Sequence, residues 1–357
     1  MMSRQPSLLI ESFAARLVAW QRSHGRHDLP WQVADPYAVW VSEIMLQQTQ
    51  VETVMPYFGR FLARFPDLAG LAAAPEDDVL ALWSGLGYYA RARNLHAAAR
   101  RMVAEHGGVF PRDFEAIEAL PGIGRSTAAA ISAFAFGERR AILDGNVKRV
   151  FCRVFGIDGW PGDKQVENRL WQLAETLLPE RDIRPYTQGL MDLGATLCRR
   201  SRPECGRCPF ADDCVAHREG REAELPTSKP RKALPERETV MLVLRRSGEI
   251  LLEKRPSSGL WGGLWSLPEC PPDEAPERAA ARLGYPATPL AALPTLSHTF
   301  THFRLAIHPC VLAAGPRQNR DEAPGHLWLT PEEARHAALP TPVRKIIESL
   351  RHQETRP

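Results

Sequence analysis

Two acidic residues, Glu43 and Asp144, have surroundings that suit acid–base chemistry. Glu43 lies in an expected helix from Pro36 to about Thr49, on the face that carries apolar residues three and four positions away. Burial disfavours the charged form of a carboxyl group, so we expect a raised pKa and a general acid. Asp144 begins another expected helix, whose amides would keep its carboxylate ionised and able to stabilise a cation. The alternatives are a glutamate paired with a buried arginine and an aspartate that only caps its helix.

Four of the seven cysteines form the pattern C-x6-C-x2-C-x5-C, and they are Cys198, Cys205, Cys208 and Cys214. The odd total and the absence of a recognisable secretion signal argue against a disulfide framework. Structural zinc usually has two paired-cysteine knuckles or a mixture of cysteine and histidine, whereas this run has a single C-x-x-C in a compact loop. We therefore expect a 4Fe-4S cluster, with zinc as the alternative.

The segment Leu120–Gly124 predicts a tight turn between two short helices. Gly122 and Gly124 stand where a Cβ would hinder positive φ or the close approach of another backbone. A turn that leads into the amide-rich start of a helix can bind an anion, and a DNA phosphate is the natural choice. The alternative is an ordinary helix-loop-helix corner.

The composition predicts two domains with different secondary structure. The chain has 357 residues and a net charge of +3, which alone does not indicate nucleic acid. Helical periodicity runs from Leu8 to about Arg221, and a linker with three prolines follows. Strands are expected at 239–244, 250–254 and within 299–311, with a turn at Ser247-Gly248 and a final helix at 342–350. The predicted domains are 1–223, with the cluster loop at 198–214, and 237–352, joined by the linker 224–236.

No apolar run in the sequence approaches the length of a membrane span. We therefore expect no membrane association and a cytoplasmic location.

The turn, Asp144 about twenty residues later and the cysteine pattern together resemble the helix-hairpin-helix DNA glycosylases that carry an iron–sulfur cluster. The segments LPW at 29–31, SEIMLQQTQV at 42–51, GLGYYARARNL at 85–95 and LDGNVKRV at 143–150 resemble the MutY branch, the adenine DNA glycosylases. The resemblance implies a mainly helical glycosylase domain, made of a six-helix barrel and an iron–sulfur lobe. An α+β Nudix-like domain would follow. It also implies double-stranded DNA with adenine opposite 8-oxoguanine or guanine as the partner. By default we expect a monomer on this DNA, associated with the nucleoid of a bacterial-type cell.

The resemblance assigns roles to residues around the two carboxylates. Glu43 would protonate N7 of a flipped adenine, and Asp144 would stabilise the oxocarbenium-like sugar, directly or through a transient covalent bond. Ser126 and Asn146 match positions that help place the water and Asp144. Because related bifunctional enzymes have a lysine where Ser126 stands, we expect hydrolysis alone, which leaves an abasic site.

The resemblance also assigns residues that contact the two bases. Asp192 matches a position that hydrogen-bonds the adenine edge, and apolar side chains would line the base pocket: Trp31, Leu46 and Val51. Other residues match those that wedge into the base stack and contact 8-oxoguanine: Gln48, Thr49, Leu86 and Tyr88.

The second domain resembles the Nudix fold without the carboxylates needed for hydrolysis. Glu269 and Gly284 keep the spacing of a Nudix box, but Ala281-Arg282 replaces the paired glutamates that would bind magnesium. In the MutY family this domain recognises 8-oxoguanine through a Phe-Ser-His loop, which Phe300-Thr301-His302 matches with threonine in place of serine. We expect the domain to read the lesion and not to hydrolyse pyrophosphates.

Three other functions are compatible with parts of the sequence. They are a bifunctional pyrimidine-lesion glycosylase and lyase of the endonuclease III type, a DNA-binding protein without activity, and a Nudix hydrolase. Ser126 disfavours the first, the two carboxylates disfavour the second, and Ala281-Arg282 disfavours the third.

Overall fold

The computed structural model describes residues 6–229, 233–316 and 325–354, and they form two compact units. The first unit is Met1–Ala72 with Ala97–Arg231, and the second is Ala73–His96 with Lys232–Pro357. Helix α5 (Glu76–Trp83) and the first part of α6 (Ala90–His106) therefore belong to the second unit. No helix of the described residues is both long and apolar enough to cross a membrane.

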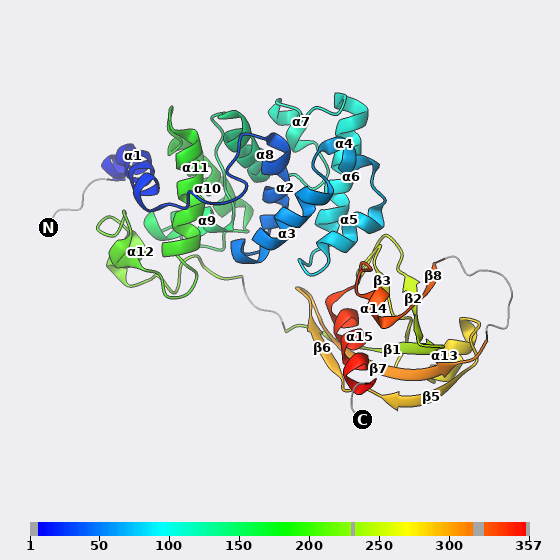
Figure 1. Ribbon diagram of the computed structural model, residues 1–357. Helices are drawn as coiled ribbons and strands as arrows, with labels where there is room; N and C mark the ends of the chain where they lie inside the picture. Colours follow the sequence, from blue (N-terminus) through cyan, green and yellow to red (C-terminus); the bar gives the residue numbers. More distant parts are fainter. Residues whose placement is uncertain (1–5, 230–232, 317–324, 355–357) are drawn as a thin grey trace. The chain divides into compact units, whose positions relative to one another are not determined.

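The first unit is built from helices, as the sequence predicted (Figure 1). Its longer helices are α1 (Pro6–His24), α2 (Pro36–Leu46), α3 (Val51–Arg64), α9 (Gly145–Val154), α10 (Lys164–Thr176) and α11 (Ile183–Asp192). Its shorter segments are α4 (Leu68–Ala73), α7 (Phe114–Glu118), α8 (Arg125–Ile131), η1 (Ser132–Phe136), η2 (Leu193–Leu197), η3 (Cys205–Arg207) and α12 (Val215–Glu219).

Aromatic packing joins the N-terminal helix to the cysteine-rich loop. Phe13 on α1 stacks on Phe210, with ring centroids 4.3 Å apart and an interplanar angle of 9°. Phe151 on α9 meets Phe13 edge to face at 6.0 Å. All three side chains are fully buried, so this core fixes α9 relative to the loop that carries the cysteines.

Helix α2 ends three residues before the predicted Thr49. Gln48 has φ of 57°, in the left-handed region, and a helix cannot continue through such a residue. The result is a turn at 47–50 between α2 and α3, on which Gln48 and Thr49 lie.

The second unit contains one mixed sheet in the order β3-β2-β1-β7-β5. β1 and β7 run parallel, and the other pairs are antiparallel. The strands are β1 (Glu236–Arg246), β2 (Glu249–Lys254), β3 (Trp265–Ser266), β4 (Glu269–Cys270), β5 (Ala287–Ala292), β6 (Leu296–Thr299), β7 (Arg304–Ala314) and β8 (His326–Leu329). The helices after β4 are α13 (Pro276–Arg282), α14 (Pro331–Ala334) and α15 (Thr341–Glu354). The predicted α+β class is confirmed.

Two turns define this sheet. Ser247 and Gly248, with φ of 50° and 84°, connect β1 to β2 as predicted, because a two-residue hairpin turn of this kind requires positive φ at both positions. The stretch predicted as strand within 299–311 instead contains a hairpin tip at 300–303, between β6 and β7. Of the predicted linker 224–236, residues 230–232 lie outside the described residues, and Glu236 already belongs to β1.

Candidate active site and cysteine-rich loop

The predicted acid, Glu43, faces a cavity in the first unit. Helix α2 begins at Pro36 because the Asp35 carboxylate accepts hydrogen bonds from the amides of Tyr37 and Ala38. One turn on either side of Glu43, Val39 and Leu46 line the same cavity. The glutamate is therefore held on an apolar face, where a carboxylate lacks the solvation it has in water.

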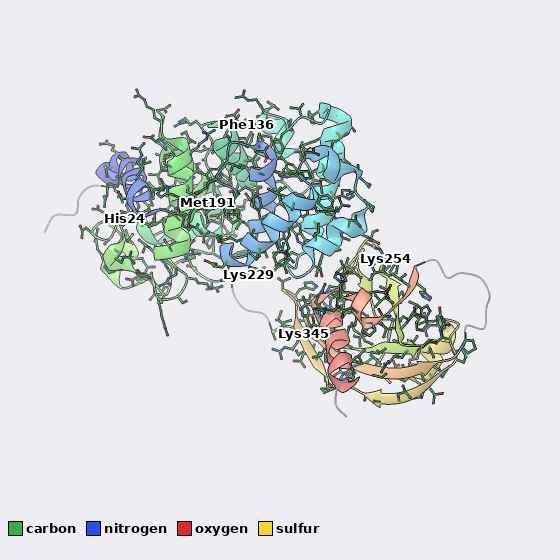
Figure 2. All side chains as sticks on the ribbon, viewed as in Figure 1. His24, Phe136, Met191, Lys229, Lys254 and Lys345 are labelled. Carbon is green, nitrogen blue, oxygen red and sulfur yellow. The ribbon has the colours of Figure 1, made fainter. Side chains whose placement is uncertain are left out.

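The cavity has a volume of about 470 Å³, which is within the usual range for small-molecule sites. The predicted pocket residues Trp31, Leu46 and Val51 all line it. The Trp31 ring is held by an edge-to-face contact with Phe58 at 5.4 Å. Met191, labelled in Figure 2, lines the cavity from α11. The other lining residues are Gln21, Arg26, His27, Leu29, Gln32, Val33, Ala34, Val39, Ser42, Glu43, Phe134, Arg184, Pro185 and Gln188.

Asp144 is the N-cap of α9, as predicted, and its Oδ1 accepts a 2.8 Å hydrogen bond from the amide of Val147. Burial raises the pKa of Asp144, whereas the amides of Val147 and Asn146 and the Arg149 guanidinium lower it. The helix start therefore opposes the cost of burying this anion.

The two carboxyl groups influence each other. Burial and, as the smaller cause, the negative charge of Asp144 together raise the pKa of Glu43 to about 8. The backbone amides and the Arg149 guanidinium lower the pKa of Asp144, and no such interaction with a described residue lowers the pKa of Glu43. The pKa of Asp144 is still raised overall, but its hydrogen bonds favour the charged form, so Glu43 is the group that retains a proton at neutral pH.

Ser126 and Asn146 shape the backbone around Asp144. The Ser126 Oγ accepts a 2.9 Å hydrogen bond from the amide of Leu143, the residue before Asp144. The Oδ1 of Asn146 accepts a 2.7 Å hydrogen bond from Arg149, which also donates to the carbonyls of Gly194 and Cys198. A Cβ at Gly194 would lie only 2.6 Å from Cβ of Asn146, so glycine is required for η2 to approach α9 this closely.

Asp192 lies behind the cavity wall. The side chain is fully buried, and its oxygens accept hydrogen bonds from the Arg26 amide at 2.9 Å, the Arg26 Nε at 2.7 Å and the Gln188 Nε2 at 2.8 Å. Arg26 and Gln188 both line the cavity, whereas Asp192 is not among the described residues that line it. The carboxylate thus orients two polar wall residues that sequence reasoning missed, since Arg26 lies 166 positions away and nothing local links the two.

The predicted hairpin turn lies between α7 and α8. Gly122 has φ of 78°, which favours glycine, and Gly124 is the N-cap of α8. Gln47, at the end of α2, donates from Nε2 to the Gly122 carbonyl and to the Thr127 hydroxyl, both at 3.4 Å. This side chain ties the turn to the segment that carries Gln48. The contact of either glycine with a phosphate stays a prediction.

Leu86 and Tyr88 lie on a loop of the second unit. Tyr88 has φ of 49° and is half exposed, whereas Leu86 is buried. The Arg91 guanidinium donates to the carbonyls of Leu86 and Gly87 and lies 5.6 Å from the centre of the Tyr88 ring. The loop is therefore ordered by its own contacts, with one aromatic ring presented to solvent.

The four predicted cysteine ligands line one small cavity. Cys198 follows η2, Cys205 and Cys208 lie in and after η3, and Cys214 is the N-cap of α12. None of the four forms a disulfide. The buried Arg153 of α9 also lines the cavity, and its Nη1 lies 3.5 Å from the Cys198 Sγ. Four thiols outside any disulfide thus line the same small cavity.

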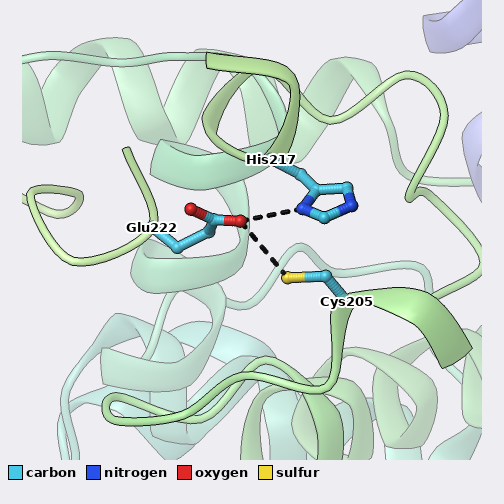
Figure 3. Close-up of side chains that lie close together, drawn as sticks. All are labelled: Cys205, His217 and Glu222. Carbon is cyan, nitrogen blue, oxygen red and sulfur yellow. Dashed lines mark hydrogen bonds and ion pairs between the residues drawn. The ribbon is translucent and has the colours of Figure 1, made fainter. Parts of the chain in front are cut away.

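His217 and Glu222 lie beside one of these cysteines (Figure 3). Nδ1 of His217 and Oε1 of Glu222 are 2.8 Å apart, and the same carboxylate oxygen lies 3.8 Å from the Cys205 Sγ. His217 is exposed. The Glu222 carboxylate therefore links the His217 ring to the Cys205 thiol.

Comparisons with known proteins match both units. Residues 41–176 match the HhH-GPD superfamily base excision DNA repair protein family, and residues 239–349 match the NUDIX domain family. An adenine DNA glycosylase of Buchnera aphidicola subsp. Acyrthosiphon pisum is 36% identical over 342 residues, which cover 95% of this chain and 97% of that protein. The chain belongs to the adenine DNA glycosylase family. The human adenine DNA glycosylase is 35% identical, with 97% of this chain and 75% of that protein covered.

Solved structures of other DNA glycosylases match the helical part of the chain. A thermostable thymine-DNA glycosylase has 30% identity and a TM-score of 0.54, covering 60% of this chain and 98% of that one. An endonuclease III–DNA complex has 20% identity and a TM-score of 0.53, which shows the shared fold. The endonuclease III type of activity is not favoured, because the adenine DNA glycosylases match nearly the whole chain. The protein is accordingly a base-excision-repair hydrolase of N-glycosyl bonds.

Proposed function

We propose that this protein hydrolyses the N-glycosidic bond of adenine paired with 8-oxoguanine or guanine in duplex DNA. The observation that carries the proposal is a pair of interacting carboxyl groups: Glu43 lines the cavity and keeps a proton at neutral pH, and Asp144 accepts hydrogen bonds at a helix start, which favour its charged form. Cleavage of a glycosidic bond requires one acid and one anion in these roles.

The arrangement supports a stepwise hydrolysis. Glu43 donates its proton to N7 of an adenine that has been flipped into the cavity, so the electrons of the C1′–N9 bond leave with a neutral base. Asp144 stabilises the positive charge that develops on the sugar. A water molecule then adds to C1′ and gives up a proton, which restores Glu43. The products are free adenine and an abasic site.

Arg26 and Gln188 provide the polar edge of the base pocket in this proposal. Both line the cavity, and Asp192 fixes both by accepting their hydrogen bonds. Their donors and the Gln188 carbonyl can meet the donor and acceptor pattern of a purine edge. Asp192 acts through them as a positioning residue.

Ser126 supports a monofunctional enzyme. Its Oγ is engaged by the Leu143 amide, and a hydroxyl does not form the Schiff base through which a lysine leads to strand cleavage. Lys148 near this helix start pairs with Glu167 at 2.5 Å.

We propose further that Cys198, Cys205, Cys208 and Cys214 hold a 4Fe-4S cluster. The donor set fits, because four thiols without disulfides line one cavity beside the guanidinium of Arg153. Such a cluster would cross-link the loop that packs on α9. The C-terminal unit would recognise 8-oxoguanine through Phe300, Thr301 and His302.

A panel of duplexes tests this function. Adenine release is measured with adenine opposite 8-oxoguanine, guanine or thymine, together with a duplex that carries an oxidised pyrimidine. We expect release from the first two only, and strand breaks only after alkali. Release of the oxidised pyrimidine with direct strand cleavage would contradict the proposal and favour the endonuclease III type of activity.

A further inference from the structure

The hairpin proposed to read the lesion has a two-residue tip. Thr299 of β6 pairs with Arg304 of β7, and the amide of Phe300 donates to the carbonyl of Phe303 at 2.8 Å. Thr301 and His302 are therefore the two turn residues, and both are exposed. The side chains available for a base lie at the end of a narrow hairpin.

The turn residues alone do not favour this tip. Two-residue hairpin turns match the twist of the strands when one or both residues have positive φ, which is why Asn-Gly and Gly-rich sequences are common there. Neither Thr301 nor His302 has a positive φ. Side-chain packing must therefore contribute to holding the tip in place.

Aromatic rings supply this packing. Phe300 stacks on Phe303, with centroids 4.6 Å apart and an angle of 25°. Trp261, from the loop between β2 and β3, lies 5.6 Å from the ring of Phe300 and 5.9 Å from that of His298. His298 meets Phe300 edge to face at 4.6 Å. Because Trp261 is buried and comes from another segment, it fixes the hairpin to the body of the unit.

Trp261 is in turn held by Arg255 and Glu269. Nη1 of Arg255 donates to Oε1 of Glu269 at 2.6 Å, and its Nε donates to the carbonyl of Leu260 at 3.0 Å. The guanidinium lies 5.8 Å from the centre of the Trp261 ring. Glu269 itself is fixed in β4, where it pairs with Met241 of β1. A continuous path of contacts thus runs from the sheet to the hairpin.

We propose that Glu269, Arg255 and Trp261 form a positioning relay that sets the orientation of the Phe300–His302 tip. Glu269 is the carboxylate that keeps the spacing of a Nudix box. Ala281 and Arg282 replace the paired glutamates that would bind magnesium, and Arg255 forms an ion pair with Glu269. A residue of the Nudix-type motif thus has a structural role in lesion reading. The inference rests on the proposed role of the hairpin.

The test compares adenine release from A:8-oxoguanine and A:G duplexes by the full chain. The ratio of the two kcat/KM values is measured for wild type and for Phe300→Ala, Trp261→Ala, Trp261→Phe and Glu269→Gln. We expect Trp261→Ala and Glu269→Gln to lower the ratio roughly 2- to 10-fold, as for the loss of an aromatic contact, with release from A:G within about twofold of wild type. Trp261→Phe should restore most of the preference.

The matched control is Glu274→Gln, which removes the Arg282 ion pair in the same unit and should leave the ratio unchanged. An unchanged ratio in Phe300→Ala would refute the proposed reading hairpin itself. A lowered ratio in Phe300→Ala with wild-type ratios in Trp261→Ala and Glu269→Gln would overturn the relay alone. Equal losses of adenine release on both duplexes would also overturn the relay. If Trp261→Ala fails to fold, a wild-type ratio in Glu269→Gln would overturn it.

Discussion

Replacing Glu43 with glutamine should stabilise the protein at alkaline pH. The glutamine resembles the protonated glutamate, so it avoids placing a second negative charge beside Asp144 in a buried site. The Glu43 pKa is about 8, against an ordinary value of 4.5. Because each unit of pKa difference corresponds to about 1.4 kcal/mol, the largest effect is about 5 kcal/mol.

The sign follows from the raised pKa of the folded state. The stabilisation by the bound proton is fully present below pH 4.5 and is lost as pH rises through about 8. Wild type and Glu43→Gln should therefore have similar free energies of unfolding near pH 4.5. The variant should be more stable by about 3 kcal/mol at pH 7 and by up to about 5 kcal/mol at pH 9.

Urea titrations followed by circular dichroism at pH 4.5, 7 and 9 measure this difference. The control is Glu105→Gln, which removes an exposed glutamate paired with Arg101. Its effect should stay below about 1 kcal/mol at every pH. If Glu43→Gln is no more stable than wild type at pH 9, then Glu43 is not a buried acid and the reasoning is refuted.

Three further outcomes are expected. The rate constant for adenine release should fall about tenfold per pH unit above pH 8, since Glu43 must carry a proton; a flat profile to pH 10 would contradict this role. Gly194→Ala should lower the free energy of unfolding by about 1–3 kcal/mol and slow adenine release, because its Cβ would meet Asn146 at 2.6 Å. The control is Gly59→Ala on α3, where an added Cβ would have no neighbour within 4 Å; this substitution should leave the free energy of unfolding unchanged or raise it. Cys208→Ser should lose bound iron, measured by elemental analysis; full iron content would exclude this cysteine as a ligand.

The chemistry-bearing residues could be predicted from the sequence where local pattern decided their placement. Asp144 is a helix cap, and Glu43 shares a helix face with apolar neighbours; both relationships span only a few residues. Arg26 and Gln188 could not be predicted, because their role depends on Asp192 and on the tertiary packing of segments far apart in the chain.

Backbone conformation explains the remaining differences in the fold. The left-handed Gln48 ends α2 early, although glutamine has no preference for that region. The hairpin tip at Thr301-His302 lacks the glycine or asparagine that would mark a turn, so only the family resemblance, and no local signal, predicted a loop there. At the hairpin tip, aromatic contacts outweigh the local preference of the sequence.

The most direct test of the central claim is single-turnover release of adenine from an A:8-oxoguanine duplex by Asp144→Asn. The asparagine keeps the size of the side chain but removes the negative charge that would stabilise the sugar cation. We expect the rate constant to fall about 100- to 1,000-fold, as for the loss of one electrostatic contact to a transition state, while the duplex is still bound. A rate constant within tenfold of wild type would contradict the mechanism.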